Sequence, residues 1–232
     1  VRPVQVVWFK RDLRVFDHAA LAAAARRGPV LPLYIAEPGL WSQPDAAGRH
    51  WAFIAECLRE LTGDLAALGQ PLVVRQGEAI PVLDALLHRL PVESHADTAN
   101  GWTYDRDLAV ACFLRAHGIP WHQLPQNGVV RALASRDRWS RTWEQRMGAP
   151  LEAAPTLRPL GLDLGPEGLG AIPSARDLGL SDDPCPGRQP GGRCAGVEAL
   201  EGFLMKRGDG YHREMSSPLT AFDSCSRLSP HL

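Results

Sequence analysis

Val4–Phe9 reads VQVVWF, a short apolar run with β-branched residues, typical of a strand that is buried on both faces. A polar stretch, Lys10–Asp17, follows it. Next comes the alanine-rich segment His18–Arg27, a helix that Asp17 is expected to cap and Gly28 to end. A strand that leads into a helix is the unit from which parallel sheets are built. These first residues therefore predict an α/β fold.

The alternation of apolar runs and helical patterns continues to about residue 123. It predicts a doubly wound, Rossmann-like, five-stranded parallel sheet with helices on both faces. Pro32 lies inside the second apolar run and indicates an edge strand or a bulge. The further strands are expected at Val30–Ala36, Pro71–Arg75, Val92–His95 and Ile119–Gln123, and the further helices at Arg49–Leu68, Ile80–Leu90 and Tyr104–His117.

Glycine and proline concentrate between Gly148 and Gly196, where ten Gly and eight Pro occur in 49 residues. Proline removes a backbone donor and glycine adds backbone freedom, so we expect neither long helices nor central strands here. A connector of this length indicates a domain boundary. A helical pattern resumes over Val197–Arg207. We therefore expect an α/β domain over residues 3–130, a linker over 131–196, and the short helical start of a second domain over 197–232.

Charge and cysteine content exclude several classes of protein. Lys and Arg number 25 against 26 Asp and Glu, so no global basic field attracts nucleic acid. The five cysteines form no CxxC pair and no HExxH spacing occurs, so we expect neither a disulfide scaffold nor a metal site. No apolar run reaches eighteen residues, and charges come too early for a signal peptide. These features predict a cytosolic protein without a membrane segment.

The loops after the predicted strands are the expected binding edge, because ligands of open parallel sheets lie beyond the carboxyl ends of the strands. These loops are Lys10–Arg14, Ala36–Trp41, Gln76–Glu78 and His95–Trp102. The first has no glycine, which argues against a dinucleotide fingerprint, and no GxxxxGKS/T phosphate loop occurs. The charged side chains of the first loop either pair among themselves, which the spacing favours, or face a ligand: Lys10, Arg11, Asp12 and Arg14.

Two other segments carry hydrogen-bonding groups. The segment after the fourth strand sets polar groups beside an aromatic plane, which suits a flat heteroaromatic ligand, although the same groups can cap the next helix: His95, Asp97, Asn100 and Trp102. Ser216–Leu232 is rich in hydroxyl groups, which either cradle a phosphate or form a solvated turn. Spacing leaves both questions open.

The chain carries three motifs in a fixed order: VVWFKRDLRVFDHAAL (Val6–Leu21), GWTYDRD (Gly101–Asp107), and YHREM with SCSRLSPHL (within Tyr211–Leu232). Together they resemble the cryptochrome/DNA photolyase family. The resemblance implies a doubly wound antenna domain followed by a helical domain that holds FAD. It also implies light-driven repair of pyrimidine dimers in DNA by reduced FAD, with a folate, a deazaflavin or a flavin as antenna chromophore.

The resemblance assigns candidate residues to two cofactor sites. For FAD they are Tyr211, Cys225, Ser226, Arg227, Leu228 and Ser229. For the antenna chromophore they are Lys10, Arg11, Glu37, His95, Asp97, Asn100 and Trp102. Cys225 stands where the family usually has threonine, which weakens the phosphate loop. His18 stands where the family often has asparagine, so the helix cap is expected to rest on Asp17 alone. Ala96 leaves only Asp97 as an acidic residue for a folate.

The sequence given ends at Leu232, where a full family member continues for roughly another domain. We therefore expect this polypeptide alone neither to hold FAD tightly nor to repair DNA. Damaged DNA is the expected partner of the full-length family, not of this chain by itself. The alternatives are a stand-alone module that binds an antenna pigment, a nucleotide or a protein partner, or a fragment of a blue-light-sensing cryptochrome.

Overall fold

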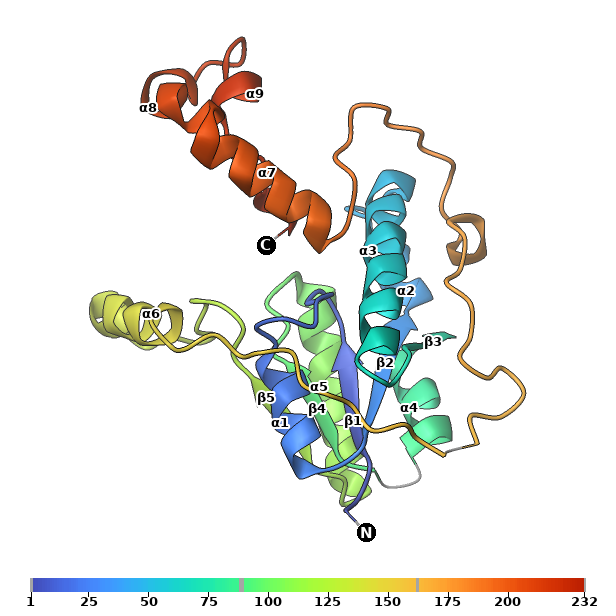
Figure 1. Ribbon diagram of the computed structural model, residues 1–232. Coiled ribbons are helices and arrows are strands. Elements are labelled where there is room, and N and C mark those ends of the chain that lie inside the picture. The colour runs from blue at the N-terminus through green and yellow to red at the C-terminus, as the bar shows by residue number, and fades with distance from the viewer. Residues whose placement is uncertain (1, 88–89, 162, 232) are drawn as a thin grey trace.

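The computed structural model describes residues 2–87, 90–161 and 163–231. Its centre is the five-stranded parallel sheet that the sequence predicts, and its strand order is β3-β2-β1-β4-β5 (Figure 1). The direction of winding reverses between β1 and β4, and the carboxyl ends of these two strands flank the switch point where ligands of such sheets bind. The strands are β1 (Gln5–Phe9), β2 (Val30–Ala36), β3 (Val73–Gln76), β4 (Val92–His95) and β5 (Trp121–Leu124).

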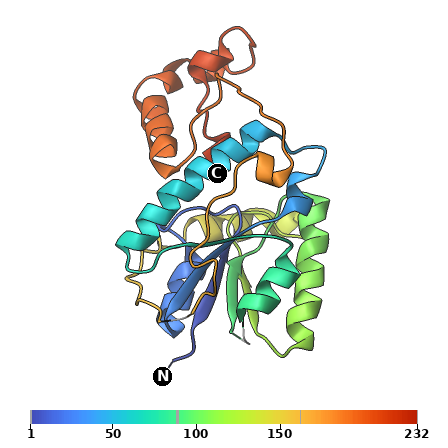
Figure 2. The same ribbon diagram turned by 90° about the vertical axis from the view of Figure 1, so that its right-hand side faces the viewer.

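Helices cover both faces of the sheet, with one hydrophobic core on each side (Figure 2). α1 (Ala19–Arg27) and α3 (Gly48–Ala67) pack on one face, whereas α4 (Ala79–Leu87) and α5 (Gly101–Ala116) pack on the other. All five residues of β1 are buried, because side chains of a central strand point alternately into the two cores. The predicted strand that is buried on both faces is confirmed.

Pro32 lies in a central strand and not at a sheet edge, so that prediction is wrong. β2 pairs with β1 on one side, where Pro32 stands opposite Val7, and with β3 on the other. Pairing with β3 begins only at Leu33, opposite Val73. Pro32 therefore lies beyond the end of the β3 ladder, where a missing N–H interrupts no pair with that strand.

The first helix is capped by His18 and not by Asp17. His18 is the N-cap, and its Nδ1 accepts a hydrogen bond from the Leu21 N–H at 3.0 Å. Nδ1 is as many bonds from Cα as the Oδ1 of asparagine, so histidine can take the place of that cap. Asp17 has a φ of 50°, and its carboxylate accepts from the Glu152 N–H at 3.2 Å. Asp17 thus fastens the later chain to this loop.

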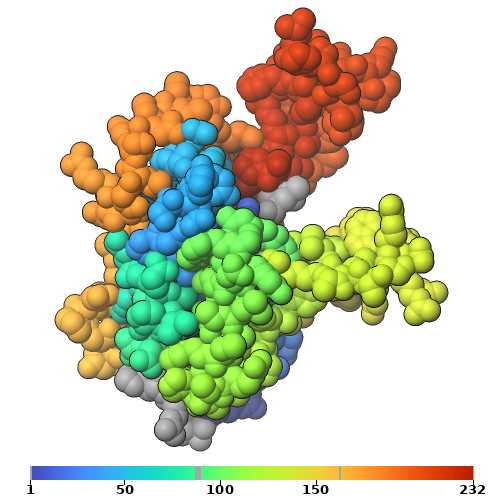
Figure 3. All heavy atoms as spheres, turned by 180° about the vertical axis from the view of Figure 1, so that it is seen from behind, coloured from blue at the N-terminus to red at the C-terminus, as the bar shows by residue number. Residues whose placement is uncertain are grey.

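In its described residues, the predicted linker contains one α-helix and two short 3-10 turns, follows the sheet edge, and ends within the helix that begins at Arg193, four residues earlier than predicted. α6 (Trp139–Met147) projects as an arm from the α/β layers (Figure 3). Further on, the backbone crosses the edge strand β3, where the Val74 N–H donates to the Leu169 carbonyl at 2.7 Å. The Arg75 guanidinium holds the same turn by donating to the carbonyls of Leu164 and Gly168. The exposed edge of the sheet is covered in this way.

The C-terminal segment (residues 188–231) stands above the carboxyl ends of the strands (Figure 1). It contains α7 (Arg193–Met205), α8 (Tyr211–Glu214), α9 (Ala221–Ser224) and connecting turns. Two carboxylates of α3 bind the amides at the start of α7: Glu56 accepts from Gly191 at 2.7 Å and Glu60 from Cys194 at 3.0 Å. Carboxylates stabilise a helix N-terminus, so these contacts dock the segment on α3. None of the helices described has the length and hydropathy that a bilayer crossing requires.

Candidate functional site

A cavity of about 760 Å³ lies at the carboxyl edge of the sheet. Its floor comes from the ends of β1 and β2 and from the loops that follow β1 and β4. One wall comes from α3, another from α2 (Pro38–Trp41) and α5, and the C-terminal segment closes the side opposite the sheet. The cavity thus occupies the switch point of the fold, where the strand order predicts a ligand.

Five of the seven antenna candidates line this cavity: Lys10, Arg11, Glu37, Asp97 and Asn100. The other two lie elsewhere. Trp102 lines a smaller cavity of about 330 Å³ between α4 and α5, and His95 belongs to a buried cluster with Asp12. Asn100 also caps α5, since its Oδ1 accepts from the Thr103 N–H at 3.1 Å. Asn100 therefore does both things that the sequence left open: its side chain caps α5 and also lines the cavity.

A buried ion network forms the floor of the cavity. Arg106 of α5 pairs with Glu37 and lies 3.0 Å from Asp97 Oδ2 and 2.8 Å from Asp107 Oδ1. Lys10 Nζ lies 2.9 Å from Asp107 Oδ2. Both cations also lie over the ring of Trp8, at 4.5 and 4.7 Å from its centroid. Three carboxylates thus face two cations, so the network carries one negative charge in excess when Glu37 is ionised and none when Glu37 is protonated.

That excess charge acts on Glu37. Its side chain is 2% exposed. Burial raises the pKa of Glu37 to about 7; Arg106 opposes this rise, and Glu78 adds to it. A neighbouring cation does not fully restore the ionised form, because Arg106 is shared with two other carboxylates. Glu37 can therefore take up a proton, or a hydrogen-bond donor in its place, near neutral pH.

The rim of the cavity carries the opposite charge. Arg11, Arg14 and Arg193 line it, and the ion pairs of the described residues include none of the three. Arg193 lies over the ring of Phe16, and Arg14 donates to the Asp17 carbonyl. The predicted salt-bridge network within the first loop is wrong, since Lys10 pairs with α5 and the two arginines of that loop stay available to an anion.

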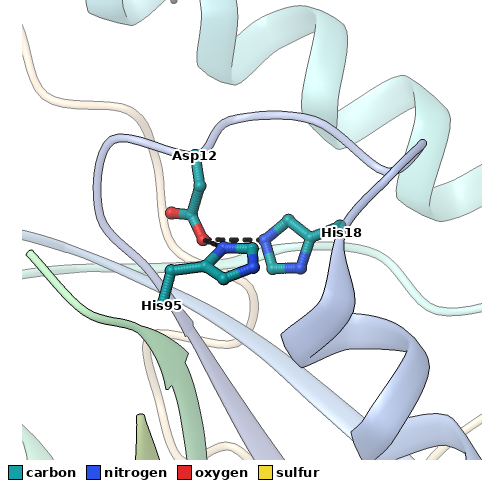
Figure 4. A group of neighbouring side chains, drawn as sticks. All are labelled: Asp12, His18 and His95. Atoms are coloured by element: carbon teal, nitrogen blue, oxygen red, sulfur yellow. Dashed lines mark hydrogen bonds and ion pairs between the residues drawn. The ribbon is translucent and has the colours of Figure 1, made fainter. Parts of the chain in front are cut away.

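Asp12 lies beneath the cavity, bound to two histidines (Figure 4). Its Oδ2 lies 2.6 Å from His95 Nδ1 and 2.8 Å from His18 Nε2, and its Oδ1 accepts from the Lys10 N–H at 2.9 Å. Burial opposes ionisation, but the hydrogen bonds and charge of His18 and His95 hold the pKa of Asp12 well below its ordinary value. The cluster joins the loop after β1 to α1 and to β4.

Two histidines and one carboxylate also form a possible metal-ligand set, which we tested by the hydrogen bonding of His18. His18 Nδ1 accepts from Leu21, so in neutral His18 the proton is on Nε2, the atom that faces Asp12. A histidine that binds a metal donates through its other nitrogen, which is the opposite arrangement. Burial lowers the pKa of His18, in agreement with a neutral ring. The geometry fits a hydrogen-bonded anchor and does not fit a metal.

The FAD candidates lie in the C-terminal segment, and among them only Leu228 lines the large cavity. Tyr211 is exposed, and its ring packs edge-on against Phe203 at 5.6 Å. The carbonyl oxygens of Cys225 and Ser226 accept from Arg207. Apart from Leu228, none of the FAD candidates lines either of the two cavities described above.

Sequence reasoning missed several residues of the cavity. Arg106 and Asp107 stand in the GWTYDRD motif, but no pattern in one sequence shows that they reach β1. Trp8 was assigned to a buried strand, which is correct, and its position at the strand end also brings it to the cavity. The sequence could not predict Arg193 as a cavity residue, because Arg193 lies near the first loop only when α7 is docked on α3.

A doubly wound parallel sheet with a cavity at its switch point, covered by a helical segment, defines a Rossmann-like α/β fold. Residues 5–146 match the family model for DNA photolyase. This match spans more than half of the chain, and the chain therefore belongs to the DNA photolyase family.

Known proteins of this family resemble the chain over nearly its whole length. It is 29% identical to a deoxyribodipyrimidine photo-lyase of Halobacterium salinarum, over 99% of this chain and 51% of that protein. It is 27% identical to a cryptochrome DASH of Natronomonas pharaonis, over 98% of this chain and 52% of that protein. The chain thus spans about half the length of the curated relatives it matches.

Solved structures share the fold. A bacterial class III photolyase from Agrobacterium tumefaciens superposes with a TM-score of 0.77 at 22% identity, over 100% of this chain and 50% of that one. An archaeal photolyase from Sulfolobus tokodaii, solved with two FAD molecules, gives a TM-score of 0.70 at 19% identity, over 98% of this chain and 51% of that one.

Proposed function

We propose that this chain is the light-harvesting part of a photolyase or cryptochrome, and that it binds an antenna pigment in the cavity at the switch point. The observation that carries the proposal is the charge arrangement of that cavity. Its floor is aromatic and acidic, with Trp8 and Glu37 both in contact with Arg106, and its rim is cationic, with Arg11, Arg14 and Arg193. A ligand with a planar heteroaromatic ring and an anionic tail would match this arrangement, with its ring at the floor and its tail at the rim.

The size of the cavity supports the same class of ligand. A volume of about 760 Å³ suits a molecule of the size of a flavin mononucleotide or a deazaflavin. Within the described residues, the chain itself supplies the floor, the walls and the closing segment, so pigment binding needs no second polypeptide. This observation also favours the alternative that the chain works as a stand-alone pigment-binding module.

We extend the proposal to the organisation of the chain. Residues 3–130 form the antenna domain, 131–196 the linker and 197–232 the start of the FAD-binding domain. In a protein that contains the whole domain, bound FAD would supply the light-driven electron transfer that splits a pyrimidine dimer in DNA. The residues from Tyr211 to Ser229 are proposed to be only part of an FAD site, so that the chain alone neither holds FAD tightly nor repairs DNA; in support, the Tyr211 ring packs on Phe203, and Arg207 donates to the carbonyls of Cys225 and Ser226.

Titration of the purified chain with FMN, 5-deaza-FMN, FAD and a reduced folate tests this function. We expect at least one pigment to bind with a dissociation constant in the micromolar range or below and to quench tryptophan emission, because Trp8 lines the cavity. Ala99 is exposed and lines the same cavity, so Ala99→Trp should abolish binding, whereas the exposed Ala116→Trp on α5 should not.

Two outcomes would contradict the proposal. The first is that no pigment binds to the wild-type chain. The second is that Ala99→Trp still binds the pigment, which would place it outside the cavity. Flavin that this variant retains through purification would in addition overturn the proposal that the chain alone does not hold FAD tightly.

A further inference from the structure

A positively charged arm projects from the α/β layers after β5 (Figure 1, Figure 3). The arm consists of residues 127–147, which form a turn, a short 3-10 turn (Arg136–Arg138) and α6. Neither hydrophobic core, as the described residues form it, contains a residue of this arm. The side chains of the arm are therefore not committed to the interior of the protein.

Arginine dominates the charge of the arm. The arm carries five arginines against one aspartate and one glutamate, a formal net charge of +3 in a chain whose net charge is −1. Two arginines are used within the fold, since Arg131 donates to the Asp97 carbonyl and Arg146 to two carbonyls of the turn before α6. The other three are exposed, and the ion pairs of the described residues include none of them: Arg136, Arg138 and Arg141. These guanidinium groups are available to an anionic ligand.

Two exposed tryptophans lie among these arginines. Trp139 is 43% exposed and Trp143 is 44% exposed. They are four residues apart in α6, so they share one side of the helix. Arg136 lies three residues before Trp139, across the 3-10 turn, where residues at this spacing lie above one another. One side of the arm thus presents a guanidinium group followed by two indole rings.

Contacts within the arm hold both rings in place. Trp139 Nε1 donates to the Gly128 carbonyl at 2.9 Å, and the Trp143 ring lies so close to Gly128 that a Cβ there would clash with it. Ser135 begins the 3-10 turn, since its Oγ accepts from the Asp137 N–H at 3.2 Å. Because the rings are already positioned in the free protein, a ligand that uses them loses little conformational entropy on binding.

We propose that the arm binds a single-stranded nucleic acid, with its two tryptophans stacking on bases and its exposed arginines binding phosphates. Such a strand alternates an anionic phosphate with a flat aromatic base, which is the pattern that this side of the arm complements. Stacking and phosphate contacts do not read the identity of a base, so binding is independent of sequence. The inference goes beyond the proposed pigment function and does not depend on it.

Two other occupants fit the arm less well. A helix that lies on an anionic membrane keeps its cations on the side opposite its apolar residues, whereas Arg136 shares the side of the tryptophans. An acidic peptide supplies carboxylates for the arginines but no row of flat rings to stack on the indoles. Both occupants are therefore compared with a nucleic acid in the test.

Fluorescence anisotropy of labelled oligonucleotides with the whole chain tests the proposal. At physiological salt we expect oligothymidylate and oligouridylate to bind with dissociation constants of roughly 10⁻⁴–10⁻⁶ M, the range of sequence-independent binding. An abasic strand of the same length keeps the phosphates and lacks the bases, so it should bind about tenfold more weakly. A duplex of the same length should also bind more weakly, because its bases already stack on each other.

Variants separate stacking from charge. Trp143→Leu keeps an apolar side chain against Gly128 and removes the ring, so it should weaken oligothymidylate about tenfold and the abasic strand less than about twofold. The double variant Arg138→Gln and Arg141→Gln should weaken both strands alike. It should also reduce the slope of log affinity against log salt concentration by about 1.4, since each phosphate contact of a single strand contributes about 0.7. Arg115→Gln, at an exposed position of α5, is the matched control and should change neither affinity nor slope.

Several outcomes would overturn the inference. Equal affinity of the wild-type chain for oligothymidylate and for the abasic strand, the duplex or polyglutamate would mean that charge alone is recognised. Equal weakening of both strands by Trp143→Leu would exclude stacking on that ring. Tighter binding to phosphatidylserine vesicles would make the arm a membrane contact, and displacement of the strand by FMN would place the strand in the cavity. A chain that binds a pigment but no oligonucleotide overturns this inference and leaves the proposed function intact.

Discussion

Asp12 is a single charged group that holds three parts of the fold together. It is buried, and the donors around it come from its own loop, from the start of α1 and from the end of β4. A buried carboxylate is stable only when its oxygens are fully used, as they are here. The carboxylate thus sets the position of the loop that carries Lys10 and Arg11 into the cavity.

Asp12→Asn is expected to destabilise the protein by about 3 kcal/mol, because the amide group would face the N–H of His18 or His95 and leave it unpaired. Urea unfolding at pH 7 measures the change in the free energy of unfolding. Asp84→Asn, at an exposed position, is the matched control and should stay within about 0.5 kcal/mol of wild type. A loss below 1 kcal/mol would contradict the role of Asp12. The pKa of Asp12 is lower in the folded protein than its ordinary value of 3.8 in the unfolded chain. The stability that ionised Asp12 contributes is therefore fully present above pH 3.8, and it is lost as the pH falls through the folded-state pKa.

His18→Asn tests the neutral ring in the same cluster. Burial lowers the pKa of His18, so below its ordinary value of 6.5 the unfolded chain binds a proton that the folded chain does not. Wild-type stability should therefore fall as the pH decreases below 6.5, and the variant should show a smaller fall. The Leu21 amide should stay protected from hydrogen exchange, because asparagine also caps helices. An unchanged pH slope would show that His18 does not titrate in this way.

At the level of elements, the linker acts as a cover for the edge strand β3. Gly170 has a φ of 74°, and a Cβ there would lie 2.0 Å from the Val74 carbonyl oxygen. Close approach of two backbones, rather than flexibility alone, explains this glycine. The nearby Gly168 also has a positive φ, of 55°, but a Cβ there meets nothing within 4 Å.

Gly170→Ala should therefore detach the linker from β3, whereas Gly168→Ala should cost only the strain of a left-handed alanine, roughly 1 kcal/mol. Hydrogen exchange of the Val74 amide, which donates to Leu169, reports the difference directly. We expect faster exchange in Gly170→Ala alone. Equal exchange rates in the two variants would mean that backbone strain, not the steric clash, decides the effect.

The elements also show what a single sequence can predict. The five strands are each within a few residues of their predicted ranges. β1 and β2 are mostly apolar runs that are buried at every residue, whereas β4 and β5 contain polar residues and could be placed only by their alternation with the helices. α2 was missed, since four residues are too few to show a period. α6 was missed although Trp139, Trp143 and Met147 stand four residues apart, the spacing of one helix face; in the fold all three side chains are exposed.

For the molecule as a whole, the sequence predicts the sheet edge at which the cavity lies, but it does not predict all the residues that line the cavity. The rule for open sheets selected the correct edge, and five of seven antenna candidates line the cavity there. Arg106 and the C-terminal segment were not predictable, because their place depends on helix packing and on docking between distant parts of the chain. The same holds for His95, which β4 directs to Asp12.

Glu56 connects the two parts of the molecule, since its carboxylate binds both Arg188 and the amide of Gly191. Glu56→Ala should loosen the C-terminal segment and speed tryptic cleavage after Arg193 at least several-fold. Glu198→Ala, on the exposed side of α7, should leave cleavage unchanged. Cleavage that FMN slows in the wild-type chain, and does not slow in Glu56→Ala, would show that pigment and docking stabilise each other. Equal cleavage of both variants would contradict the docking role.

The docked C-terminal segment has a kinetic consequence. Leu200, Leu228 and His231 cover the cavity on the side away from the sheet, whereas the exposed residues Ala99 and Arg11 leave part of its rim open to solvent. A small molecule can therefore enter and leave without displacement of this segment from α3. Docking of the segment should slow the exit of a ligand that spans the whole cavity more than the exit of a ligand that occupies only the open rim.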